Sequence, residues 1–215
     1  MIPNNKIFEF DDIIDIDSQI LIGEYFKNQH HKFGYYKKNI SLGDDSTGEY
    51  VFPGWSINID NNFKVDNKIM DIIKEIEKKS IEKCGLEYKT NYRYKLNAFP
   101  PLPVTPTINE LYKNIHRDSK IEHIVLIYYV NDIDGNTLLF KNKIGDDSES
   151  NRIVEDEIKN GNTQNITLFK EITPKRGKVI IFSGNLLHCA GWPTNDVRYN
   201  INYNIVIKTK KKGLI

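Results

Sequence analysis

The sequence predicts a mainly β protein with two supporting helices near the N-terminus. From residue 89 onward apolar and polar residues alternate, as in "YRYKLNA", and this period of two is typical of a half-buried strand. Further apolar segments follow, separated by Gly, Asn, Asp and Pro: "IEHIVLIYYV", "NTLLF", "NITLFKEI", "GKVIIFS" and "RYNINYNIVI". Several short strands joined by turns indicate a sandwich, jelly roll or barrel.

Two N-terminal segments have helical periodicity. A first helix is predicted over residues 19–31, with Asp17 or Ser18 as its cap. A second is predicted over residues 67–84, capped by Asp66. Its apolar stripe follows the spacing of one buried helix face and consists of Ile69, Ile72, Ile73 and Ile76. We expect both helices to cover one sheet from outside.

Length and composition are those of an ordinary globular protein. The 215 residues fit one domain, in which residues 1–88 would pack on a core formed by residues 89–207. The 30 basic and 29 acidic side chains nearly cancel, so overall charge favours neither a nucleic acid nor a membrane as partner. Two cysteines and the lack of a signal-peptide pattern or a long apolar stretch predict a cytoplasmic protein. Residues 143–162 are polar enough to form a mobile insertion between strands.

The segment "NIHRDSKIEHIVLIYYV" places two metal-ligand side chains directly before a strand. In an extended segment His116 and Asp118 project to the same face. They would supply two parts of a 2-His-1-carboxylate triad, which holds Fe(II) and leaves coordination positions open. A surface ion pair at a strand end is the alternative. The third ligand is expected to be His188, since "GKVIIFSGNLLHCAGWP" places it on a late strand; His123 is expected to be dispensable, as are His30 and His31.

Arg198 opens the last strand, ten residues after His188. An arginine offers a planar fork that suits a carboxylate, and a buried one is costly without an anionic partner. Tyr129 is a candidate hydroxyl donor to the same carboxylate. Asn200 and Asn202 share the face of Arg198 and would present amides to the same cavity. These residues predict a carboxylate-binding pocket beside the metal, as iron enzymes of this type need for the far carboxylate of 2-oxoglutarate.

Taken in order, these motifs resemble the Fe(II)/2-oxoglutarate-dependent oxygenases, in particular their prolyl-4-hydroxylase-like branch. The resemblance covers residues 90–207 and rests on "HRD", "IYYVNDIDGNTLLF", "ITPKRGKVIIFSG", "LHCAGWP" and Arg198. It implies a double-stranded β-helix, that is, a jelly-roll, cupin-like core. It also implies iron between His116, Asp118 and His188, oxoglutarate on Arg198, and Thr137 and Tyr129 near that cosubstrate. Collagen-type prolyl hydroxylases usually have Lys at the position of Arg198, so the match is nearer to the wider superfamily.

The resemblance implies a dioxygenase that uses Fe(II), 2-oxoglutarate and O2, with ascorbate as reductant, and releases succinate and CO2. The implied substrate is a peptidyl, proline-like residue, so the partner would be a protein or peptide. Two alternatives stay open. The strand "RYNINYN" is similar to the Arg-x-Asn-x-Thr-x-Arg of AlkB-type nucleic-acid demethylases, although Asn202 and Asn204 replace its Thr and second Arg. The second alternative is a non-catalytic, metal-binding β-roll that serves as an interaction module. Loops at 42–56, 99–111 and 143–162 would select the substrate.

Overall fold

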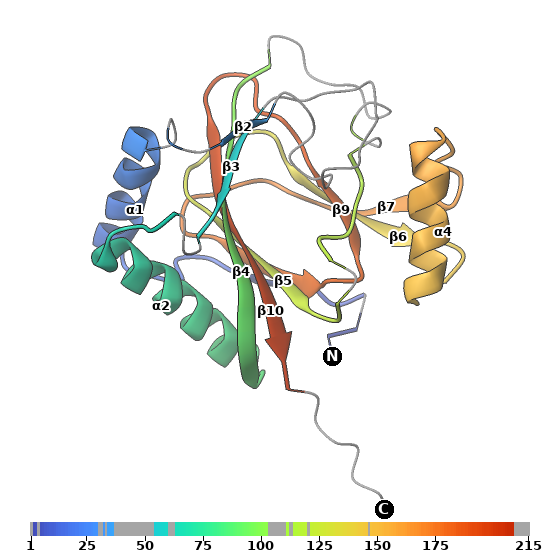
Figure 1. Ribbon diagram of the computed structural model, residues 1–215, viewed down its shortest axis with the longest axis horizontal. Helices are drawn as coiled ribbons and strands as arrows, with labels where there is room; N and C mark the ends of the chain where they lie inside the picture. The colour runs from blue at the N-terminus through green and yellow to red at the C-terminus, as the bar shows by residue number, and fades with distance from the viewer. Residues whose placement is uncertain are drawn as a thin grey trace, which may run out of the picture.

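A computed structural model confirms the mainly β fold and the jelly-roll core. It describes residues 2–3, 5–29, 32, 34–36, 54–59, 63–102, 111, 114–119, 121–145 and 147–208. Two antiparallel sheets form the centre. Helices α1 (Ile16–Gln29) and α2 (Asn67–Lys83) lie on one side of them, and helix α4 (Ser148–Lys159) lies on the opposite side (Figure 1). Most of the predicted substrate loops 42–56 and 99–111 fall outside the described residues, as do His30 and His31.

The larger sheet has seven strands, and β10 is at its centre. The order across the sheet is β1 (Phe8–Phe10), β8 (Val179–Ser183), β5 (Ile124–Tyr129), β10 (Arg198–Ile207), β4 (Tyr88–Phe99), β3 (Gly54–Asn58) and β2 (Gly34–Tyr36). Strand β10 pairs with β5 on one side and β4 on the other, and Asn204 lies directly opposite Arg93. The polar residues of β4 and β10 therefore share the inner face of the sheet.

The smaller sheet has three strands in the order β7 (Ile166–Ile172), β6 (Thr137–Asn142) and β9 (Leu187–Ala190). His116 extends this sheet by one residue, because its backbone exchanges two hydrogen bonds of 3.0 Å with His188. Residues paired in this way point their side chains to the same face of the sheet. The predicted position of His188 on a late strand is confirmed, and the pairing brings it next to His116.

Helices α1 (Ile16–Gln29) and α2 (Asn67–Lys83) pack on the outer face of the larger sheet, as expected. The cap predicted for α2 is confirmed, since the Asp66 carboxylate accepts a hydrogen bond of 2.9 Å from the Ile69 N–H. Its buried residues include all four isoleucines of the predicted stripe. Neither helix, nor any other in the described part of the chain, is long and apolar enough to cross a membrane.

The predicted start of α1 was wrong. The helix begins at Ile16, and the Asp15 carboxylate accepts hydrogen bonds of 2.9 and 2.8 Å from the N–H and hydroxyl of Ser18. Asp15 therefore has the role expected of Asp17 or Ser18. Ile22 and Phe26 of this helix pack against the sheet, and both are fully buried.

The polar stretch 143–162 was predicted as a mobile insertion, and this was also wrong. Its middle forms the helix α4 (Ser148–Lys159), whose N-terminus is capped by the Asp147 carboxylate. Val154 and Ile158 are buried against the smaller sheet, so the helix is packed on the core. Only these two side chains of α4 belong to the apolar cluster, which explains why the amino-acid pattern of residues 143–162 resembles that of a polar loop.

Gly184 lies where a side chain would strike a buried histidine. An added Cβ would come within 2.3 Å of Cε1 of His123, whose ring is held by a 2.6 Å hydrogen bond to the Ile121 carbonyl. We expect Gly184→Ala to destabilise the protein by about 1–3 kcal/mol. Gly23, within α1, has nothing within 4 Å of such a Cβ, so Gly23→Ala should stabilise it by about 0.5–1 kcal/mol. Urea unfolding of both variants measures these changes, and equal effects would contradict the packing argument.

Candidate metal and cosubstrate site

His116, Asp118 and His188 come together between the two sheets. The ligand atoms of the three side chains all lie within 4.8 Å of one another. Nε2 of His116 is 3.7 Å from one carboxylate oxygen of Asp118, and Nε2 of His188 is 3.9 Å from the other. This separation suits a single metal ion bound by two imidazoles and one carboxylate. The surface ion pair is excluded, because the Asp118 side chain is only 6% exposed.

Both imidazoles present Nε2 to the centre of this cluster. Nδ1 of His116 lies 2.8 Å from the Asn114 carbonyl oxygen, and Nδ1 of His188 lies 3.0 Å from that of Leu186. A carbonyl only accepts, so each Nδ1 carries a proton, and Nε2 is the nitrogen of each ring that can offer a lone pair. Nε2 of His188 is buried and has no hydrogen-bond partner among the described residues. An orphaned acceptor of this kind is what a metal ion would satisfy.

Burial also keeps His188 neutral. Desolvation, assisted by the neighbouring His116, lowers the pKa of His188 to about 4, although Asp118 acts in the opposite direction. The imidazole therefore carries no charge at neutral pH. Neutral imidazole is the form that binds a metal.

The Asp118 carboxylate is fixed by three side chains of the larger sheet. One of its oxygens, Oδ2, accepts hydrogen bonds from the amides of Asn202 and Asn204 at 2.8 and 3.0 Å. The other, Oδ1, lies 3.0 Å from Nη2 of Arg93 in an ion pair. Burial alone would raise the pKa of Asp118, but the two histidines and Arg93 hold it well below its usual range. The carboxylate is thus ionised and oriented, with Oδ2 saturated and Oδ1 left as the donor for a metal.

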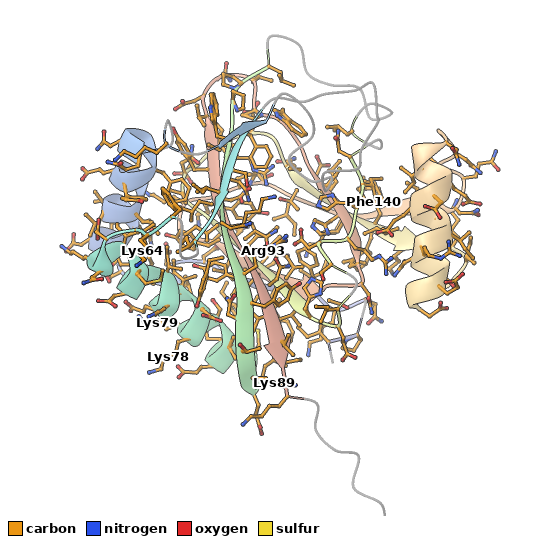
Figure 2. The ribbon with its side chains drawn as sticks, in the orientation of Figure 1. Lys64, Lys78, Lys79, Lys89, Arg93 and Phe140 are labelled. Atoms are coloured by element: carbon orange, nitrogen blue, oxygen red, sulfur yellow. The ribbon has the colours of Figure 1, made fainter. Side chains whose placement is uncertain are left out.

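Arg93 was not among the predicted site residues. It lies on β4 near the centre of the molecule in Figure 2, whereas Lys78 and Lys79 of α2 lie at the edge. Its Nε donates to Oδ1 of Asn204 at 2.5 Å, so Asn204 connects Arg93 to Asp118. The alternation of "YRYKLNA" does place Arg93, Lys95 and Asn97 on one face. Only the pairing of β4 with β10 reveals that this face is the inner one.

Arg198 is buried next to the same cavity, and only 1% of it is exposed. Its guanidinium donates to the Gly191 carbonyl at 2.9 Å and to the Thr137 hydroxyl at 2.8 Å, while the Tyr129 hydroxyl donates to Thr137 at 2.7 Å. Nε of Arg198 has no partner among the described residues, and none of their carboxylates forms an ion pair with it. A buried cation with only neutral partners favours binding of an anion from outside the chain.

The two predicted asparagines also line this cavity. Asn200 accepts a hydrogen bond of 2.9 Å from Asn97, and Asn202 donates to Asp118 as described above. Lys95 lines it as well, and burial lowers the pKa of this lysine to about 8 against the opposing effect of Asp118. The cavity thus extends from the predicted metal ligands to Arg198. His123 belongs to no metal-ligand cluster among the described residues.

Arg93→Met should destabilise the metal-free protein by about 1–3 kcal/mol, because it leaves the buried Asp118 without its countercharge. A lowered folded-state pKa contributes stability above the unfolded value, and this contribution disappears as pH falls through the folded value. The deficit should therefore shrink as the pH falls below about 3.9, the ordinary pKa of an aspartate side chain. Arg152 forms exposed pairs with Glu149 and Asp156, so Arg152→Met should change stability by less than about 0.5 kcal/mol. Urea unfolding as a function of pH measures both, and a pH-independent Arg93 deficit would contradict this account.

Comparisons with known proteins agree with this architecture. No protein-family model and no curated protein matches the sequence. Among solved structures, the chain is similar to a prolyl hydroxylase from Trichoplax adhaerens, determined in complex with a hypoxia inducible factor peptide fragment. Identity is 10%, the TM-score is 0.61, and the match covers 94% of this chain and 83% of that one. The chain has the fold of the 2OG-Fe(II) oxygenases.

Two further similar structures of this fold differ in the reaction they are named for. A prolyl-4-hydroxylase from Pseudomonas putida matches at 10% identity and a TM-score of 0.56, over 93% of this chain and 91% of that one. The alpha ketoglutarate dependent carbocyclase SnoK from nogalamycin biosynthesis matches at 12% identity and a TM-score of 0.60, over 94% and 79%. The prolyl hydroxylase fold is therefore confirmed, whereas the fold alone does not specify the substrate.

Proposed function

We propose that this protein is an Fe(II)- and 2-oxoglutarate-dependent dioxygenase. The proposal rests on one cavity. It is lined both by the oriented cluster of His116, Asp118 and His188 and by Arg198, which has no anionic partner among the described residues. His116, Asp118 and His188 would hold the iron. Arg198 would hold the far carboxylate of oxoglutarate, and Thr137 and Tyr129 would orient the guanidinium.

The side chains fit these ligands chemically. Two neutral imidazoles and one carboxylate form the donor set of non-haem iron oxygenases, and they leave positions for a cosubstrate and oxygen. Bound iron would supply the oxidising chemistry, with oxoglutarate and O2 converted to succinate and CO2 as the substrate is hydroxylated. The chain itself turns both Nε2 atoms toward the centre of the cluster, keeps His188 neutral and holds Asp118 ionised. Asn200 and Asn202 would line the cosubstrate pocket, and ascorbate is expected to serve as reductant.

We further propose a peptidyl, proline-like substrate. Support comes from the similar fold of the Trichoplax enzyme, which was determined with a peptide fragment bound. The test is an incubation with Fe(II), ascorbate and 2-oxoglutarate, in which succinate and product mass are measured with a proline-rich peptide and with methylated single-stranded DNA. We expect succinate and a gain of one oxygen atom with the peptide. Turnover only with DNA would favour a nucleic-acid demethylase, and turnover with neither would favour a metal-binding module without catalysis or a different substrate.

A further inference from the structure

The segment that carries His116 and Asp118 alternates between two environments. His116 and Asp118 point into the cavity, whereas Ile115 and Arg117 point away from it toward α4. Ile115 is 4% exposed and belongs to the same apolar cluster as Val154 of α4. Helix α4 therefore contacts this segment on both sides of His116, from behind the site.

The polar part of the contact between α4 and this segment includes three hydrogen bonds between Arg117 and Glu155. The Glu155 carboxylate on α4 accepts hydrogen bonds from Nε and Nη2 of Arg117, both at 2.8 Å, and a third of 3.1 Å from the Arg117 backbone N–H. The Arg117 side chain is only 4% exposed and that of Glu155 21%. Two parallel hydrogen bonds between a guanidinium and a carboxylate fix orientation as well as distance. Because Glu155 also accepts a hydrogen bond from the Arg117 backbone, it fixes the position of the main chain between His116 and Asp118.

The same helix also contacts the strand of the other histidine. The Asn151 side chain on α4 donates a hydrogen bond of 2.9 Å to the Asn185 carbonyl, in the turn that leads into β9. Phe140 of β6 belongs to the apolar cluster below the helix and is labelled beside α4 in Figure 2. The helix thus reaches both segments that supply the predicted metal ligands.

We propose that α4 is a brace for the metal site and that Glu155, acting through Arg117, is a positioning residue for His116 and Asp118. This inference rests on the proposed metal site but concerns a contact outside the cavity. Glu155 touches neither metal nor cosubstrate. It orients the backbone from which two ligands project, as outer-shell residues orient the ligands that bind a metal directly.

The test compares two identical substitutions on the same helix. Glu155→Gln keeps the size of the side chain but removes the charge that holds Arg117, and it should weaken Co2+ binding to the metal-free protein by about 10–100-fold. Glu149→Gln removes the charge of one of the two partners of the exposed Arg152 and should leave Co2+ binding unchanged. Arg117→Lys, which keeps a cation but loses the fork, should fall in between. Oxoglutarate affinity at saturating metal should stay near that of the unaltered protein.

A second readout needs no metal. Amide hydrogen exchange over residues 114–119 and 187–190 of the metal-free protein should be faster in Glu155→Gln than in Glu149→Gln, because the braced segment opens more often. If the unaltered protein binds no Co2+, the proposed metal site fails, and the exchange rates still decide on the brace. Unchanged exchange and unchanged Co2+ binding in a folded Glu155→Gln variant would overturn the brace alone. The brace would also be overturned if Glu149→Gln lost as much Co2+ affinity as Glu155→Gln.

Discussion

Replacing Arg198 with alanine should weaken 2-oxoglutarate binding by roughly 30-fold to several-thousand-fold. The estimate corresponds to the loss of one buried, charge-assisted partner, which costs about 2–5 kcal/mol. Arg198 is 1% exposed, and its fixed donors reach only neutral groups of the chain. The guanidinium is also held over the rings of Phe99 and Tyr129, at 5.2 and 5.7 Å. Its charge is therefore available to an anionic ligand, and its orientation is set before the ligand binds.

The measurement is an anaerobic titration of the Fe(II) form with 2-oxoglutarate, followed by its visible charge-transfer band. Arg198→Lys should recover part of the affinity, because a lysine keeps the charge but lacks the planar fork. Arg176→Ala, at an exposed position, should bind as the unaltered protein does. Iron content should be the same in all variants. Tight oxoglutarate binding by a folded Arg198→Ala variant would remove the main support for the assignment of the cosubstrate.

Replacing His188 with alanine should lower iron affinity by more than about 100-fold, since even outer-shell changes cost 10–100-fold. Nε2 of His188 is buried without a partner and faces the Asp118 carboxylate at 3.9 Å. His123 provides the matched control, because its Nδ1 also contacts a carbonyl two residues earlier and its Nε2 is also buried without a partner. His123, however, lies outside the His116, Asp118 and His188 cluster.

The experiment compares metal content after anaerobic dialysis against limiting Fe(II). We expect His188→Ala to emerge without iron and His123→Gln to retain it. The stability of the His123 variant should be measured separately, since its ring fills the space beside Gly184. Loss of iron in the His123 variant, with retention in His188→Ala, would mean that the third ligand had been wrongly assigned.

Several features that depend on near neighbours in the chain were predicted correctly, although the cap of α1 was assigned to Asp17 or Ser18 instead of Asp15. The period of two in a strand puts His116 and Asp118 on one face, and the same rule puts Arg198 and Asn202 on one face of β10. The cap of α2 lies three residues from the N–H that it satisfies. These patterns could be read from the sequence because side-chain direction within one element follows from backbone geometry alone.

Contacts between distant segments had to come from the tertiary structure. Arg93 reaches Asp118 because β4 pairs with β10 in one particular register, and no local pattern encodes that register. The sequence of helix α4 was interpreted as a polar loop, because its few apolar residues form a buried face only when they pack on the smaller sheet. The sequence thus determined which side chains make up the proposed site for iron and oxoglutarate. Sheet pairing and helix packing decided which others would hold them in place, because those contacts join residues far apart in the chain.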